Sequence, residues 1–109
     1  MSNVFLDSPP PPYYAVIFTS VRTENDQDYD QTDARMFELA RQQEGFLGLE
    51  SVQSSGRGIT VSYWRSEAAI QNWKQHTEHV QAQQRGKRDW YRDYAVRVCR
   101  VERDAFAHK

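Results

Sequence analysis

The sequence predicts an α+β fold of the ferredoxin-like type, in which strands and helices follow the order β-α-β-β-α-β and the four strands form one antiparallel sheet. Three observations support this prediction. Segments rich in aromatic and β-branched residues alternate with segments of helical apolar spacing, a short Ser-Gly link joins two strand-like segments, and 109 residues leave room for a single core.

The first half of the chain predicts one strand followed by one helix. Residues 13–23 are rich in aromatic and β-branched side chains and are expected to form the strand. The spacing of Asp28 and Gln31 resembles a capping box, and apolar residues then recur at helical intervals. Gly45 fits the left-handed position that stops such a helix.

The second half predicts a hairpin, a helix and a last strand. Strands are expected over residues 46–53 and 58–64, joined by the short link at 54–57. Ser66 is expected to cap a helix that runs to about Gly86. The last strand is predicted over residues 94–104.

Two of the predicted strands are apolar on both sides. In the first strand Tyr14, Val16 and Phe18 alternate with Ala15, Ile17 and Val21. A sheet face exposed to water should carry polar residues at every second position. Because the chain has no further element to cover the second sheet face, we expect a second copy to cover it, sheet to sheet, as a homodimer.

Composition excludes several classes of partner. Charged residues make up 27% of the chain and the net charge is −1, so we expect no nucleic acid partner. No apolar run approaches the length of about 20 residues that spans a bilayer, so no membrane partner is expected. The single cysteine, Cys99, fits a reducing cytosol, and the cytoplasm is the expected location.

The domain organisation is expected to be simple. Residues 1–12 end in four prolines and are interpreted as a Pro-rich arm, residues 13–104 as the folded domain and residues 105–109 as a tail. The sequence contains neither a dinucleotide-binding G-x-G-x-x-G motif nor a phosphate-binding loop, so no cofactor is predicted.

Three segments resemble a known family: GFLGLES, then YWRSEAAIQNWKQHTEHVQAQQRGKRDWYRDY, then VCRVERD. Over residues 13–104 the chain is similar to the antibiotic biosynthesis monooxygenase family. The resemblance implies a dimeric α/β barrel. It also implies a cofactor-independent monooxygenase-like activity on a small aromatic, quinol-type or polycyclic substrate.

The stretch NWKQHTEHVQ contains the candidate catalytic residues Trp73, His76 and His79. Two histidines three positions apart share one face of a helix, and imidazole is the side chain best suited to take a proton at neutral pH. A catalytic metal usually needs at least three protein ligands, and the remaining histidine, His108, is in the tail, so no metal site is predicted.

A substrate pocket between the second helix and the sheet is predicted to be lined by Tyr14, Phe18, Tyr63 and Trp73. Trp73 also has an alternative role in packing. Together with Ala69, Ile70 and Val80 it follows the spacing of a buried helix face. The two roles are compatible.

Two alternative functions stay open at this point. One is a non-catalytic dimer that binds a small ligand or serves a stress response. The other is haem binding or haem degradation, because Trp73 matches a tryptophan of the haem-degrading branch. In that branch a histidine ligand follows where Gln83 stands here, and the first strand carries an asparagine that this chain lacks. His79 could then act as a shifted ligand of the iron, since imidazole is a common axial group.

Overall fold

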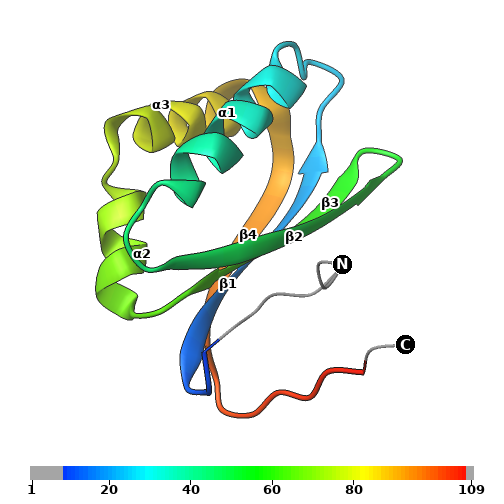
Figure 1. Ribbon diagram of the computed structural model, residues 1–109. Helices are drawn as coiled ribbons and strands as arrows, with labels where there is room; N and C mark the ends of the chain where they lie inside the picture. Colours follow the sequence, from blue (N-terminus) through cyan, green and yellow to red (C-terminus); the bar gives the residue numbers. More distant parts are fainter. Residues whose placement is uncertain (1–8, 108–109) are drawn as a thin grey trace.

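The computed structural model describes residues 9–107 (Figure 1). The first eight residues of the predicted arm and the last two of the predicted tail lie outside this part, as does the prediction made for His108. The elements are β1 (Tyr13–Arg22), α1 (Tyr29–Arg41), β2 (Phe46–Ser54), β3 (Arg57–Trp64), α2 (Glu67–Lys74), α3 (Thr77–Arg85), the π-helical turn η1 (Gly86–Trp90) and β4 (Tyr91–Val101).

The four strands form one antiparallel sheet in the order β2-β3-β1-β4. The central strand β1 pairs with β3, so that Ile17 lies opposite Val61, and with β4, so that Ile17 lies opposite Arg97. All helices lie on one side of the sheet (Figure 1). This arrangement confirms the predicted ferredoxin-like α+β fold.

The core lies between the sheet and the helices. Its buried centre is Trp64 at the end of β3, with Ala40 of α1 and Ala69 and Ile70 of α2. Partly buried apolar side chains pack against this centre: Tyr14, Val16, Phe46 and Trp73. Because side chains alternate along a strand, the even-numbered residues of β1 face the helices.

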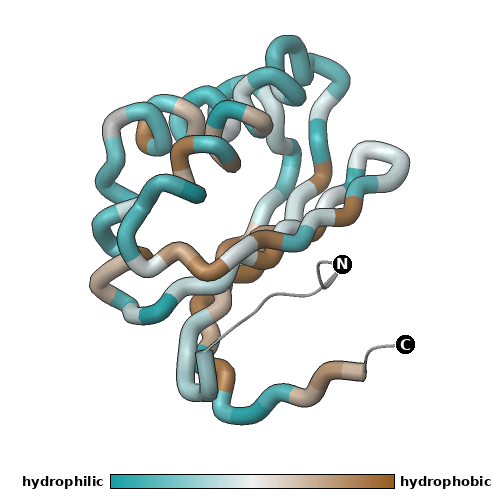
Figure 2. Tube along the Cα trace, in the orientation of Figure 1, coloured by the Kyte–Doolittle hydropathy of each residue, from teal (hydrophilic) through white to brown (hydrophobic). Residues whose placement is uncertain are grey.

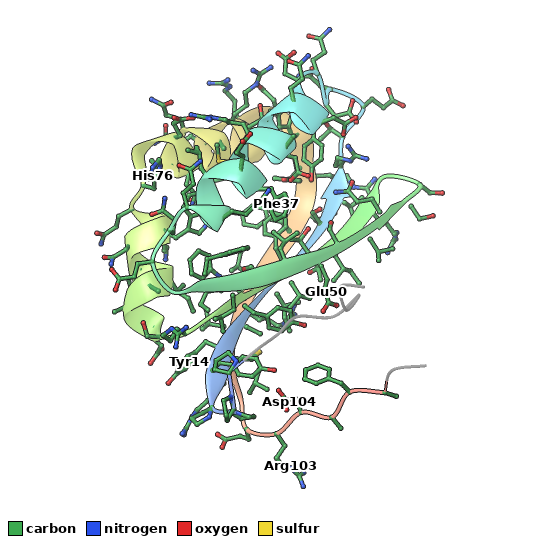
Figure 3. All side chains as sticks on the ribbon, viewed as in Figure 1. Tyr14, Phe37, Glu50, His76, Arg103 and Asp104 are labelled. Atoms are coloured by element: carbon green, nitrogen blue, oxygen red, sulfur yellow. The ribbon has the colours of Figure 1, made fainter. Side chains whose placement is uncertain are left out.

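The other side of the sheet, here called the open face, carries no helix (Figure 1). Strand alternation and register give its residues: Tyr13, Ala15, Ile17, Thr19, Glu50, Val52, Ile59, Val61, Tyr63, Ala95, Arg97, Cys99 and Val101. Figure 3 shows Glu50 on this side, and Figure 2 shows hydrophobic segments along the strands. Val52 is 72% exposed and Ile59 is 52% exposed, whereas Tyr13 and Ala15 on the same face are buried, so apolar side chains meet solvent at the hairpin end of this face in the single chain.

The structure shows what forms at the predicted helix cap, hairpin turn and helix stop. Ser66 caps α2 by accepting a hydrogen bond from the amide of Ala69, at 3.1 Å. The hairpin between β2 and β3 turns at Ser55 and Gly56, which both have positive φ as a type I′ turn requires. Gly45 is left-handed with φ 86°, but it does not stop the helix as predicted, because α1 ends at Arg41 with Gln42 as its C-cap.

The predicted capping box at Asp28 is wrong. Asp28 has φ 63°, and its side chain makes no capping hydrogen bond to α1. Its carboxylate instead accepts a hydrogen bond from Arg85, with Oδ2 at 3.3 Å from Nη2. An N-cap residue normally has extended backbone angles, so the left-handed conformation of Asp28 does not suit a capping box.

The predicted single helix over residues 66–86 is also wrong, because two helices replace it. The chain leaves helical geometry at His76, which has φ −61° and ψ 131° and precedes the first residue of α3. The helix α2 buries Ala69 and Ile70 on the sheet, whereas α3 packs beside α1. The chain changes direction between α2 and α3 (Figure 1), so His76 and His79 do not share one continuous helix.

The last strand occupies Tyr91–Val101 and not residues 94–104. Its partner strand sets both limits. Tyr13, the first residue of β1, pairs with Val101, so no strand remains to pair with residues 102–104. At the other end a register shift after Val21 brings Arg22 opposite Tyr91, which extends the pairing.

Candidate active site

The break between α2 and α3 places the ring of His79 over the indole of Trp73. The two ring centroids lie 4.3 Å apart and the planes are 13° from parallel. On the core side, Trp73 stacks on Trp64 with centroids 6.3 Å apart and an angle of 26°. Trp73 is thus held against the core, as its packing role predicts, while it contacts His79.

His79 makes one hydrogen bond that determines its tautomer. Its Nδ1 lies 3.0 Å from the main-chain oxygen of Trp73. A carbonyl oxygen can only accept, so Nδ1 carries the proton and donates it. In the neutral ring the lone pair is then on Nε2, which is the atom able to take a proton.

The surroundings keep His79 neutral. Its burial lowers the pKa below the usual 6.5, and the hydrogen bond to the Trp73 carbonyl, which raises the pKa, offsets this only in part. The neighbouring His76 lowers the pKa of His79 further. At neutral pH the ring is therefore uncharged, with an unprotonated Nε2.

His76 lies at the junction of the two helices and has a different environment. Its ring is tilted by 42° against Trp73, with the centroids 5.5 Å apart. Its Nδ1 is enclosed and finds no hydrogen-bond partner within residues 9–107. Since Nδ1 of His79 has a partner and that of His76 has none, His79 is the better oriented of the two predicted bases.

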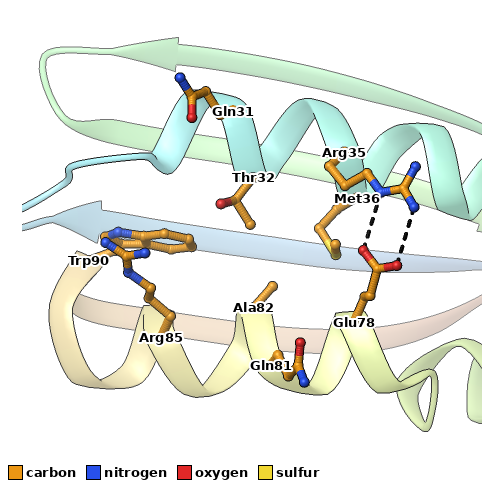
Figure 4. Close-up of a pocket in the computed structure, with 9 residues that line it drawn as sticks. All are labelled: Gln31, Thr32, Arg35, Met36, Glu78, Gln81, Ala82, Arg85 and Trp90. Atoms are coloured by element: carbon orange, nitrogen blue, oxygen red, sulfur yellow. Dashed lines mark hydrogen bonds and ion pairs between the residues drawn. The ribbon is translucent and has the colours of Figure 1, made fainter.

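A cleft of about 310 Å³ lies between α1 and α3, over the sheet (Figure 4). Side chains of both helices and of η1 line it: Gln31, Thr32, Arg35, Met36, Glu78, Gln81, Ala82, Arg85 and Trp90. Arg35 and Glu78 join the two helices across it, with Nε–Oε2 and Nη2–Oε1 distances of 3.2 Å each. This bidentate pair lowers the pKa of Glu78, the residue that precedes His79 in the chain.

The cleft could not be predicted from the sequence, because no local pattern connects its two walls. Arg35 and Glu78 are 43 positions apart, and each is an ordinary charged residue of an exposed helix face. Trp90 forms one end, where its indole lies under Arg85 at 5.3 Å and its Nε1 donates to the carbonyl oxygen of Gln27. Only the packing of α1 beside α3 brings these residues together.

The four predicted pocket residues do not line one cavity. Tyr14 and Trp73 both pack against the core cluster around Trp64. Phe18 belongs to a separate aromatic group, with the rings of Tyr91 and Tyr94 at 5.2 and 6.0 Å. Tyr63 lies opposite Ala15, on the open face, away from the other three.

Tyr63 instead lines a cavity of about 410 Å³ on the open face. Its pKa is raised by burial and by the neighbouring carboxylate of Glu50. Tyr13 donates a hydrogen bond to Asp104 at 2.6 Å, and Phe106 also borders the cavity. Glu50 is the feature of the sequence that could have indicated this cavity, because it is the one charged residue in the segment FLGLESVQ.

Within residues 9–107, no group of three or more histidine, cysteine, aspartate or glutamate residues is arranged to hold a metal ion. None of the described helices is long and apolar enough to cross a membrane.

Known proteins show the same sequence pattern and fold. The sequence model for antibiotic biosynthesis monooxygenases matches residues 12–85. An uncharacterized protein of Bacillus subtilis strain 168, YqjZ, is 55% identical over 104 residues, which cover 94% of this chain and 91% of the relative.

Two solved structures illustrate the likeness of fold. Rv0793 from Mycobacterium tuberculosis superimposes with a TM-score of 0.73 at 18% identity, covering 86% of this chain and 99% of its own. SnoaB from Streptomyces nogalater, a cofactor-independent oxygenase, gives a TM-score of 0.74 at 8% identity, covering 90% of this chain and 100% of its own. Because the family model spans most of the domain, the chain belongs to the antibiotic biosynthesis monooxygenase family.

Proposed function

We propose that this protein is a cofactor-independent monooxygenase-like enzyme that acts on an electron-rich aromatic, quinol-type or polycyclic small molecule. The observation that carries the proposal is the neutral His79, held by ring stacking and by a hydrogen bond to Trp73, with Nε2 unprotonated. Family membership and the fold shared with a cofactor-independent oxygenase support it.

In this proposal His79 is the general base. Its Nε2 takes the proton of a substrate phenol or enol, and the resulting anion is rich enough in electrons to pass one to dioxygen. The radical pair combines to a peroxide anion, which takes the proton back from Nε2. The hydroperoxide then loses water, together with the remaining hydrogen on the same carbon, and leaves one oxygen atom in the product as a carbonyl. Dioxygen is therefore the oxidant, and the protein supplies a base, orientation and exclusion of water.

Trp73 is proposed as a positioning residue for this base. Its indole and its carbonyl oxygen both contact the His79 ring, and its contact with Trp64 anchors it to the core. His76 is proposed as the less well oriented alternative base, because its Nδ1 has no fixed partner in the described part of the chain.

The test is oxygen consumption measured with a panel of hydroquinones and anthrone-like compounds. For a substrate that the parent protein oxidises, His79→Gln should lower kcat by about 10²–10⁴-fold, the usual contribution of a general base. His76→Gln is the matched control and should lower kcat much less. Equal activity of His79→Gln and the parent would exclude His79 as the base.

A second candidate function is non-catalytic binding of a small apolar ligand. The open-face cavity favours it, since it combines apolar walls with the carboxylates of Glu50 and Asp104. A parent protein that consumes no oxygen with any compound of the panel, but binds some of them in calorimetry, would support this second function.

We also propose that the protein is a homodimer assembled through the open face. The support is the apolar character of that face, with Val52 and Ile59 largely exposed in the single chain. Light scattering at micromolar concentration tests this, and a monomer would contradict it.

A further inference from the structure

The position of the His79 ring depends on how the start of α3 is held. His79 lies in the first turn of this helix and reaches back to the Trp73 carbonyl of α2 through Nδ1. The N-cap of α3, His76, makes no side-chain hydrogen bond to the helix, and its backbone is extended. The first turn is therefore not fixed by a cap of the usual kind.

An ion pair ties this turn to the neighbouring helix α1. Glu78, which directly precedes His79, accepts two hydrogen bonds from Arg35, with Nε–Oε2 and Nη2–Oε1 distances of 3.2 Å each (Figure 4). Two parallel bonds between a planar guanidinium and a planar carboxylate fix orientation as well as distance. Because Glu78 and His79 are neighbours on one short helix, a rotation of α3 that moved the imidazole would break these bonds.

The same face of α3 is attached to the start of α1 at its other end. Arg85 lies two helical turns after Glu78 on the same side of the helix. Its Nη2 donates to Asp28 Oδ2 at 3.3 Å and to the carbonyl oxygen of Gln27 at 3.4 Å. This attachment holds the far end of α3 in place, whereas the Arg35–Glu78 pair restrains the end that carries His79.

The pair contributes little to the stability of the fold. The side chains of Arg35 and Glu78 are 52% and 43% exposed, and an ion pair this open to water has a small net energy. Replacing Arg35 should therefore leave the chain folded. The variant can then report on the position of His79 and not on unfolding.

We propose that Arg35 is a positioning residue for the general base His79 and acts through Glu78. The pair sets the rotation of the first turn of α3, so that the imidazole stays stacked on Trp73 and its Nδ1 stays bonded to the Trp73 carbonyl. Nε2 is thereby held in one orientation, as proton abstraction requires. This inference rests on the proposed catalytic role of His79 and adds a residue to that site.

NMR of the free protein tests the positioning without any substrate. The His79 ring lies over the Trp73 indole, whose ring current shifts the imidazole proton signals, and the variant His79→Gln identifies these signals. Arg35→Gln should move them towards the positions of an unstacked imidazole. Arg92→Gln is the matched control and should leave them unchanged, because Arg92 also forms an exposed ion pair, with Asp93, but lies on β4.

Steady-state kinetics test whether this position matters for proton abstraction. With a substrate that the parent oxidises, Arg35→Gln should lower kcat about fivefold and leave KM unchanged, because a half-exposed pair biases an orientation only by a small factor. Arg35→Lys keeps the charge but cannot form two parallel bonds, so it should also lower kcat. The charge swap that combines Arg35→Glu with Glu78→Arg rebuilds the pair in reverse and should recover most of the kcat and of the NMR shift.

The outcomes separate this inference from the proposed function. Unchanged His79 signals in Arg35→Gln would overturn the positioning role. A raised KM with an unchanged kcat would also overturn it, because Arg35 would then bind substrate in the cleft. A parent protein that oxidises no compound of the panel removes the proposed catalytic function alone, since the NMR comparison still decides whether Arg35 positions His79.

Discussion

The imidazole of His79 and the indole of Trp73 lie ring over ring at 4.3 Å, and one hydrogen bond from Nδ1 to the Trp73 carbonyl closes the same contact. The contact joins the first residues of α3 to the end of α2, so the base and its support belong to different helices. The geometry of this pair leads to the first two predictions.

The first prediction concerns pH. The folded chain holds the pKa of His79 below 6.5, whereas the unfolded chain takes up the proton at the ordinary value. As the pH falls through 6.5 the unfolded state therefore binds more protons, and the free energy of unfolding decreases until the pH passes below the folded pKa. Denaturation by urea between about pH 5 and about pH 8 measures this decrease. The variant His79→Gln should show a smaller pH dependence, and an unchanged slope would contradict the assignment.

The second prediction concerns Trp73. Trp73→Ala removes contacts with both Trp64 and His79, and it should lower the free energy of unfolding by about 2–4 kcal/mol, somewhat less than for a fully buried tryptophan. It should also move the pKa of His79 towards its ordinary value, because water reaches the ring. An NMR titration of the His79 ring checks the shift. Trp73→Phe, which keeps an aromatic platform, should show the smaller change in both measurements.

The third prediction concerns Gly45. This residue has φ 86°, and a Cβ added to it would lie 2.6 Å from the Cβ of Ala69. Gly45→Ala should therefore cost about 2–4 kcal/mol, since strain in the left-handed region adds to a clash in the core. The control is Gly56→Ala, because Gly56 has φ 78° but no atom within 4 Å of the added carbon. It should cost only the strain, about 1 kcal/mol. If thermal denaturation showed the same loss of stability for both variants, the contact with Ala69 would add nothing to the cost of Gly45→Ala.

The fourth prediction is that the protein does not degrade haem and binds it only weakly. Gln83 stands where the related haem-degrading proteins are expected to carry a histidine, and glutamine is a poor iron ligand beside imidazole. Haemin titration followed at the Soret band should show no sharp, stoichiometric change. A sharp change that is lost in His79→Ala and kept in His76→Ala would overturn the prediction, and the free Nε2 of His79 would then be the ligand.

The sequence by itself determined the succession β-α-β-β over the first part of the chain, the hairpin at Ser55 and Gly56, and the cap at Ser66. These features depend on interactions between near neighbours, which a local pattern records. It also determined that the first strand is apolar on both sides, because strand alternation follows from backbone geometry alone. The prediction of an uncovered sheet face came from that alternation.

Tertiary structure alone decided how the candidate site is assembled. The break at His76 arises because α2 packs on the sheet and α3 packs beside α1, and neither contact is visible in the stretch NWKQHTEHVQ. Tyr63 lies on the open face because its register with Ala15 places it there, although its residue type suited the predicted pocket equally well. Asp28 forms no capping hydrogen bond because the folded chain holds it in the left-handed conformation, where its carboxylate contacts Arg85, 57 positions away.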